Sequence, residues 1–142
     1  MSSSKVEPQA STTDLHQFAD ELMRQLNLRD ADSALAPFAP DARLYAADGT
    51  TTGVEDNRAV LASVFDAFPD VTFTPVRVVA EDDWFAIGFI WAGTSTRPFN
   101  GIPATGRSFK VLEFRMFKVV DGKITEAWGL IDLASLFAQL QS

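Results

Sequence analysis

The sequence DGKITEAWGLIDLASLF, residues 121–137, contains the clearest structural signals in the chain. Its Asp-Gly pair lies between two strand-like runs, which is the strongest short indication of a two-residue hairpin turn. A strand is expected from Ile124 to Ile131, and the apolar spacing after it predicts a short helix from Leu133 to Leu140. Asp132 stands between these two elements. The stretch therefore predicts an antiparallel hairpin whose second strand ends on a carboxylate.

A two-residue turn determines which residues of the hairpin face each other, beginning with Val120 opposite Lys123. Continued along both strands, this register gives one side of the sheet both charged and apolar residues and makes the other side apolar. The mixed side has the pairs Phe117–Glu126, Arg115–Trp128, Glu113–Leu130 and Val111–Asp132, and the apolar side has Met116–Ala127, Phe114–Gly129 and Leu112–Ile131.

Two interpretations of these sides remain open. In the first, the charged side faces water and the apolar side covers the core, as in many antiparallel sheets. In the second, a curved sheet closes its charged side over a cavity, and the apolar side packs on another subunit. The strand from Trp84 to Trp91 is apolar on both faces, which favours the second interpretation.

Upstream of the hairpin, the pattern changes from helices to strands. Helices are expected from Thr12 or Thr13 to Leu26, within residues 30–38, and from Thr52 or Gly53 to Phe68. Strands are expected at 42–46, 71–80, 84–94 and about 108–120. Helices followed by consecutive strands with short connections predict an α+β fold with an antiparallel sheet. We expect one domain over residues 12–142 and a disordered tail over residues 1–11.

Composition excludes several classes of function. The chain of 142 residues is 46% hydrophobic with 12 Phe, which predicts a packed interior, and its net charge of -7 disfavours nucleic acids and anionic membranes as partners. It has no Cys and one His, so cysteine-based and histidine-rich metal sites are excluded, and no cofactor is expected. Without a membrane-length apolar run or a secretory signal, a soluble cytoplasmic protein is predicted.

The closing DGKITEAWGLID, the upstream GIPATGRSF and the order of helices and strands together resemble the SnoaL-like polyketide cyclases. This family belongs to the nuclear-transport-factor-like superfamily, with ketosteroid isomerases and limonene epoxide hydrolases. The resemblance implies a cone-shaped α+β barrel in which helices pack on a curved antiparallel sheet around an apolar pocket. It also implies a homodimer, here through the apolar side with Leu112, Phe114, Met116 and Ile131.

In the polyketide cyclases, an Asp just after the last strand is the acid/base for intramolecular aldol ring closure, and that position falls on Asp132. A catalytic His of the preceding strand falls on Arg115, and a second familiar His is replaced by Ala127. The epoxide hydrolases need an Asp-Arg-Asp constellation. The segment STRPFN, residues 95–100, lacks the carboxylate expected there, so epoxide hydrolysis ranks below cyclase-like chemistry.

Each candidate residue also has a structural interpretation. Asp132 directly before a helix is a preferred N-cap, and only a desolvated carboxyl suits acid/base work near neutral pH. Arg115 stabilises an enolate in one interpretation and pairs with Glu113 or Glu126 in the other. The predicted substrate-binding residues, which core packing or a rim position would also explain, are Tyr45, Phe89, Trp91, Phe99, Ile102, Glu113, Phe117 and Trp128.

Two hypotheses for function follow. The first is a cofactor-independent enzyme of the aldol cyclase or isomerase type, in which Asp132 and Arg115 act on a hydrophobic carbonyl compound. The second is a module that binds an apolar ligand or a protein partner without turnover. The position of Asp132, in a closed apolar cavity or at the surface as a helix cap, distinguishes the two.

Overall fold

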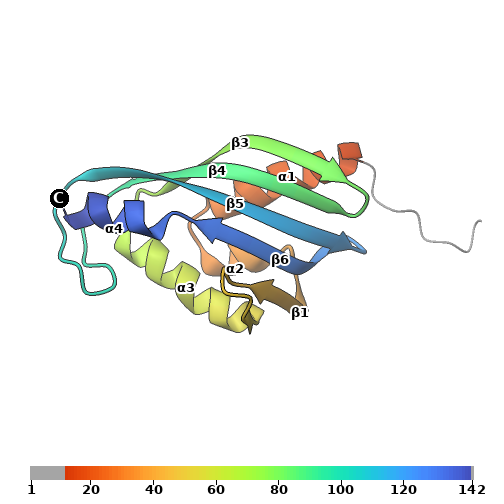
Figure 1. The fold of residues 1–142 in the computed structure, drawn as a ribbon, viewed down its shortest axis with the longest axis horizontal. Helices are drawn as coiled ribbons and strands as arrows, with labels where there is room; N and C mark the ends of the chain where they lie inside the picture. Colours follow the sequence, from red (N-terminus) through yellow and green to blue (C-terminus); the bar gives the residue numbers. More distant parts are fainter. Residues whose placement is uncertain (1–11, 142) are drawn as a thin grey trace, which may run out of the picture.

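The computed structural model describes residues 12–141, so the predicted tail lies outside the described residues. The fold is α+β, as predicted: helices pack against one side of a six-stranded sheet (Figure 1). In chain order the elements are α1 (Thr12–Leu26), α2 (Ala31–Leu35), β1 (Phe38–Tyr45), β2 (Thr51–Thr52), α3 (Val54–Ala67), β3 (Thr72–Glu81), β4 (Trp84–Thr94), β5 (Ser108–Val120), β6 (Lys123–Ile131) and α4 (Leu133–Gln141).

The sheet is mixed and open, with strand order β2-β1-β6-β5-β4-β3. Strands β3 to β6 form antiparallel pairs, as expected from their short connections. The prediction of a purely antiparallel sheet was wrong at β1, which pairs parallel with β6. The chain between these two strands contains α3 and four other strands, and that long connection permits the parallel pairing. The sheet curves around the helices but does not close into a barrel.

One hydrophobic core fills the space between the inner face of the sheet and the helices. α1 contributes Leu15, Ala19 and Leu22 at helical spacing, and the sheet contributes large aromatic residues such as Phe85 and Phe117. No helix in residues 12–141 is long and apolar enough to cross a membrane.

The β5–β6 hairpin follows the predicted register only next to its turn. Val120 faces Lys123 and Val119 faces Ile124, but Lys118 then faces Glu126, so Thr125 is an additional, unpaired residue. This β-bulge shifts every later pair by one position. The predicted pairs beyond it were therefore wrong, and the observed pairs are Phe117–Ala127, Met116–Trp128, Arg115–Gly129, Phe114–Leu130 and Glu113–Ile131.

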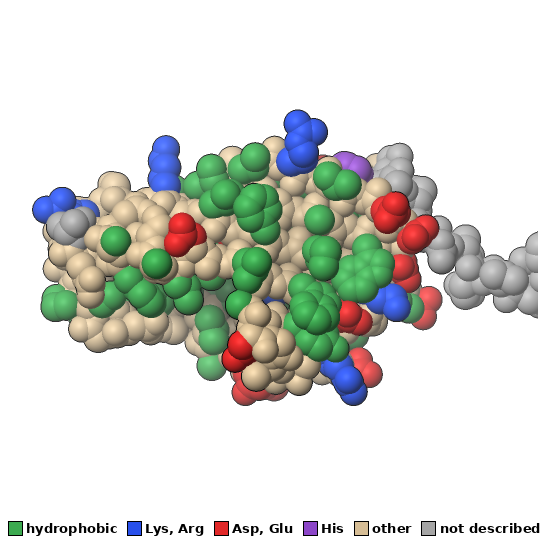
Figure 2. Space-filling view, in the orientation of Figure 1, with side chains coloured by type: hydrophobic (Ala, Val, Ile, Leu, Met, Phe, Trp, Pro, Cys, Tyr) green, Lys and Arg blue, Asp and Glu red, His purple; other side chains and the backbone are tan. Residues whose placement is uncertain are grey.

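The shift changes which side chains of β6 face the helices. Glu113, Arg115 and Phe117 of β5 share the inner face with Ala127, Gly129 and Ile131 of β6. Placing Ile131 on the outer apolar face was thus wrong, because the bulge turns it toward the core. The outer face instead exposes apolar side chains that spread across the sheet in Figure 2, among them Val79, Leu112, Phe114, Met116, Trp128 and Leu130.

Candidate active site

A cavity of about 320 Å³ lies between the inner face of the sheet and the helices. Hereafter it is called the apolar cavity. Six of the residues predicted from sequence line it: Phe89, Trp91, Phe99, Glu113, Arg115 and Phe117. Its other lining residues are Leu22, Met23, Leu26, Ala34, Phe38, Asn57, Val60, Leu61, Val64, Phe73, Asn100, Ile131, Leu133 and Leu136.

Glu113 brings a carboxyl group into this apolar surrounding. It points inward from the middle of β5 and is only 8% exposed. Both of its oxygens accept hydrogen bonds: Oε1 from Trp91 Nε1 at 2.8 Å and Oε2 from Arg115 Nη1 at 3.4 Å. Burial raises the pKa of Glu113 above its ordinary value, and the charge of Arg115 and the two hydrogen bonds offset part of that effect. Such a carboxyl group can accept or release a proton closer to neutral pH than an exposed one.

Arg115 lies beside this carboxyl, two residues further along the same face of β5. Its guanidinium carbon is 5.2 Å from the centre of the Phe117 ring. Across the strand pair, Gly129 has no side chain, and a Cβ atom there would come within 3.0 Å of Arg115 Nε. That Nε is buried and, among the described residues, has no acceptor. The guanidinium is therefore held by one ion pair and one aromatic face, and it keeps donors available for a ligand.

The mouth of the cavity is marked by apolar side chains that water reaches. Val60 of α3 is 58% exposed and Leu133 of α4 is 46% exposed, yet both line the cavity. The loop after β4 contributes Phe99, which packs on Phe68 with ring centres 4.9 Å apart. Val60 and Leu133 therefore mark where the apolar cavity opens to solvent.

The loop over residues 95–107 is held at its base by Ser95, which is buried. Ser95 Oγ accepts a hydrogen bond from Thr105 N at 3.1 Å, and its backbone bonds to Gly106 and Arg107. At the tip, Phe99 and Ile102 form an isolated bridge. Phe99 reaches the apolar cavity, whereas Ile102 packs against the core and is absent from the cavity lining.

Asp132 lies outside the apolar cavity. Its side chain is exposed, and Oδ1 accepts a hydrogen bond from Ser135 N at 2.9 Å, in the first turn of α4. This is the N-cap arrangement. The residues on either side of it, Ile131 and Leu133, line the cavity, so Asp132 belongs to the rim.

Tyr45 and Trp128 also lie away from the apolar cavity. They face each other across the parallel β1–β6 pair and stack with ring centres 4.0 Å apart. Trp128 donates a hydrogen bond from Nε1 to Glu126 at 2.9 Å. The sequence-based register had placed Trp128 on the same face as Arg115, and the bulge at Thr125 turns it to the outer face instead.

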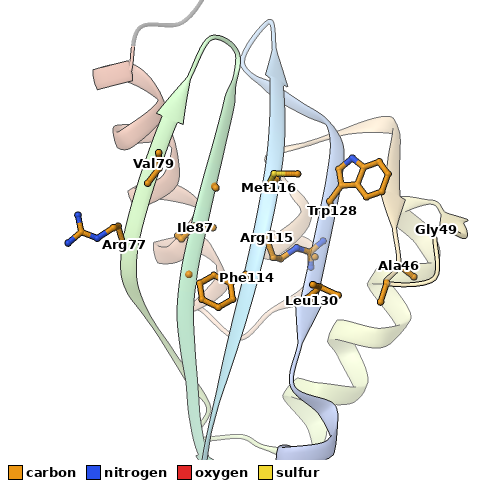
Figure 3. A pocket seen from close by; sticks show the side chains of 14 residues that line it. Ala46, Gly49, Arg77, Val79, Ile87, Phe114, Arg115, Met116, Trp128 and Leu130 are labelled. Carbon is orange, nitrogen blue, oxygen red and sulfur yellow. The ribbon is translucent and has the colours of Figure 1, made fainter.

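Trp128 borders a broad groove of about 560 Å³ on the outer face of the sheet. Figure 3 shows its labelled side chains from β3, β4, β5, β6 and the segment after β1. Phe114 lies over Gly88 there, where a Cβ atom would be 2.7 Å from the ring. The groove is lined almost entirely by apolar residues, and Arg77 is the charged residue of its wall; Arg115 also borders the groove, but its guanidinium pairs with Glu113 on the inner face.

Sequence reasoning missed Asn57 and the two residues of the cavity mouth. Asn57 is one helical turn before Leu61 on the face of α3 that lines the cavity. A polar residue within an apolar helical stripe was the available signal. In residues 12–141, no three His, Cys, Asp or Glu side chains lie together as a candidate metal site.

The chain thus combines an α+β fold, helices on one side of a six-stranded sheet, and an apolar cavity that contains a buried carboxyl group. The family model of the SnoaL-like polyketide cyclases matches residues 13–140. The chain belongs to the SnoaL-like polyketide cyclase family.

Solved structures show the same fold. AclR from Streptomyces galilaeus has a TM-score of 0.86 at 24% identity, covering 92% of this chain and 97% of AclR. IdmH from Streptomyces antibioticus, named as a proposed polyketide cyclase, has a TM-score of 0.79 at 29% identity, covering 89% and 98%. A protein with a ketosteroid isomerase-like fold from Catenulispora acidiphila has a TM-score of 0.70 at 20% identity, covering 87% and 92%. A comparison with curated proteins gives no match.

Proposed function

We propose that this protein is a cofactor-independent acid/base enzyme of the aldol cyclase or isomerase type, acting on a hydrophobic carbonyl compound. Glu113 is the proton-transferring group, and Arg115 stabilises the oxyanion. The observation that carries the proposal is the buried, hydrogen-bonded carboxyl group of Glu113 in an otherwise apolar cavity. Membership of the cyclase family supports the reaction class.

Glu113 is preferred to Asp132 as the acid/base because of where each carboxyl group lies. Glu113 lines the apolar cavity and has a raised pKa, which favours proton exchange with carbon acids. Asp132 is exposed and occupied as a helix cap. Its rim position suits a role in holding α4, whose Leu136 faces the cavity.

The proposed reaction begins when the Glu113 carboxylate removes a proton from the carbon next to a substrate carbonyl. The carbonyl oxygen becomes an enolate, and Arg115 donates to it. In an aldol closure, the enolate carbon bonds to a second carbonyl carbon of the same molecule. That second oxygen then takes the proton from Glu113. In an isomerisation, the proton returns to a different carbon, and in both cases Glu113 ends as it began.

Exchange of α-protons tests this proposal without the natural substrate. The bicyclic ketone 2-tetralone in D₂O exchanges its α-protons for deuterium upon enolisation, and ¹H NMR follows the loss of signal. We expect the protein to accelerate exchange above buffer and Glu113→Gln to lower the acceleration by about 10²- to 10⁴-fold. Asp132→Asn keeps a good capping residue and should retain the activity.

The outcomes separate the candidate roles. Loss of exchange in Asp132→Asn with full activity in Glu113→Gln would assign the acid/base to Asp132. A ketone that binds without accelerated exchange would favour the second candidate, a non-catalytic binding module. One observation favours that candidate: both oxygens of Glu113 already have donors, in Trp91 and Arg115.

We also propose that two copies of the chain form a homodimer through the outer face of the sheet. The support is the set of exposed apolar side chains on that face, centred on Phe114, Trp128 and Leu130. A contiguous apolar surface of this kind is unusual on a monomer.

A further inference from the structure

Trp91 of β4 bonds directly to the proposed acid/base. In the β4–β5 pair, Phe89 faces Glu113. Trp91 is two residues further along β4, so it is the diagonal neighbour of Glu113 on the inner face. Aromatic side chains are long enough to span that diagonal. The Trp91 indole does so, and its Nε1 donates a hydrogen bond to Glu113 Oε1 at 2.8 Å.

The Trp91 indole is also held from β3, the strand on its other side. Phe73 faces Trp91 across the β3–β4 pair, and the two rings meet edge to face with their centres 5.5 Å apart. The side chain of Asn27 accepts a hydrogen bond from Phe73 N at 2.8 Å and donates one to Phe73 O at 2.9 Å. The indole therefore has a support that does not depend on the carboxyl group of Glu113.

The two oxygens of Glu113 are held unequally. The bond from Trp91 to Oε1 has an ordinary length, whereas Arg115 Nη1 lies 3.4 Å from Oε2, beyond the usual range. An indole N–H is a hydrogen-bond donor only. While Trp91 donates to it, Oε1 acts as an acceptor. The proton of the neutral carboxyl group therefore belongs on Oε2.

We propose that Trp91 is a positioning residue for the acid/base: it holds Oε1 of Glu113 as an acceptor and leaves Oε2 as the oxygen that exchanges the proton with the substrate. This inference rests on the proposed function. It also changes the role predicted for Trp91 from sequence. Because its one N–H is already used by Glu113, Trp91 meets a ligand with its apolar ring.

The proposal links proton transfer to the movement of Arg115. In the first step, the substrate C–H bond breaks, an O–H bond forms at Oε2, and the electron pair stays on the enolate. Glu113 thereby loses its charge and most of its attraction for Arg115. The guanidinium becomes free to donate to the enolate oxygen, which gains its negative charge in the same step.

Arg115 is the charged group that faces Glu113. In residues 12–141, the other side chains that line the apolar cavity are uncharged, and they come from all four helices, from the loop after β4 and from β1, β3, β4, β5 and β6. Tyr45 of β1 shares a smaller hollow with Glu113 and Arg115, and tyrosine titrates near pH 10. Burial raises the pKa of Glu113, and the charge of Arg115 and the bond from Trp91 offset part of that effect.

NMR of the natural protein tests the bond directly. The indole N–H signal of Trp91, identified by its loss in Trp91→Phe, should shift with pH at the same midpoint as the Glu113 carboxyl carbon. This N–H should stay protected from solvent exchange on both sides of the midpoint, because Oε1 accepts in both states. Glu113→Gln should abolish the shift. The indole of Trp84, on the same strand but outside the apolar cavity, is the internal control.

Trp91→Phe keeps an aromatic ring and removes the donor. The pKa of Glu113 should rise, because a hydrogen bond that favours its charged form is lost. In the 2-tetralone assay, the pH of half-maximal exchange should rise with it. Below that pH, exchange should be about tenfold slower than in the natural protein, with KM for the ketone nearly unchanged. Trp84→Phe is the matched control and should change neither quantity.

Each part of the proposal has its own contrary result. An unchanged pKa of Glu113 in folded Trp91→Phe would overturn the positioning role. Rapid solvent exchange of the Trp91 N–H at a pH where Glu113 is neutral would overturn the assignment of the proton to Oε2. If the natural protein does not accelerate exchange of 2-tetralone, it is the proposed function that fails, and the NMR titration still decides whether Trp91 holds the carboxyl group.

Discussion

The environment of Glu113 links its protonation to folding. Its carboxyl group is buried, with Trp91 and Arg115 as its polar neighbours, and its pKa in the folded chain lies above the ordinary value of 4.5. The folded state therefore binds this proton more tightly than the unfolded state does. By linkage, Glu113 contributes stability that is fully present below pH 4.5 and is lost as the pH rises through the folded pKa.

Glu113→Gln should remove this dependence, because glutamine keeps the shape and a hydrogen-bonding oxygen but carries no charge. As the pH is raised from 4 to about 8, we expect the free energy of unfolding of the variant to increase relative to that of the natural protein. Urea denaturation at several pH values measures the difference. A gap that stays constant over this range would mean that burial does not perturb Glu113.

At the scale of elements, the bulge in β6 determines which residues face Arg115 in the candidate site. Without the extra Thr125, Trp128 would oppose Arg115, as the turn alone predicts. With it, Gly129 takes that place, and the Arg115 side chain lies against the bare backbone of β6. Gly129 is thus a positioning residue for Arg115 and, through it, for the carboxyl group of Glu113.

Gly129→Ala should displace Arg115, because the new Cβ would lie 3.0 Å from Nε and 3.2 Å from Cγ. As Arg115 withdraws, the pKa of Glu113 loses a lowering influence and should rise further, which NMR titration of its carboxyl carbon measures. Gly88→Ala is the matched control: its Cβ would meet the exposed Phe114 ring on the outer face. An unchanged Glu113 pKa in folded Gly129→Ala would refute the positioning role.

The sequence predicted most elements because their signals are local. The Asp-Gly turn, the helical spacing in α1 and the apolar run of β4 each depend on neighbouring residues. No local signal marks the bulge, since Thr125 is an ordinary strand residue. The bulge places Trp128 and Ile131 on the faces opposite to those that the turn alone predicts. The parallel β1–β6 pair joins Tyr45 to Trp128, too far apart in sequence for periodicity to reveal.

The candidate site was predicted in part for the same reason. Phe89, Trp91, Glu113, Arg115 and Phe117 alternate along β4 and β5, and those strands pair without irregularity, so period-two alternation places them together. The position of Asp132 along the chain follows from counting residues after the Asp-Gly turn. The direction of its side chain, however, depends on how α4 begins. At that point the backbone amide of Ser135 donates a hydrogen bond to the Asp132 carboxylate.

At the scale of the molecule, the outer face is the largest feature that the monomer leaves unexplained. Phe114 is 57% exposed and Leu130 is 62% exposed, and they belong to one apolar surface across the sheet (Figure 2). With a net charge of -7, two copies associate only if the apolar contact exceeds their mutual repulsion. Salt should therefore strengthen the proposed dimer by screening that repulsion.

Leu130→Glu should convert the proposed dimer to a monomer, because a two-fold interface would receive two unpaired carboxylates in a dry apolar contact. We expect association to weaken by at least about a hundredfold, measured by sedimentation velocity at micromolar concentration. Leu28→Glu is the matched control, since Leu28 is 56% exposed but lies in the turn after α1. A natural protein that sediments as a monomer would refute the interface.

The apolar cavity is lined within one chain, so the Leu130→Glu monomer should still exchange the protons of 2-tetralone. Loss of that activity on dissociation would mean that a partner subunit supports the site.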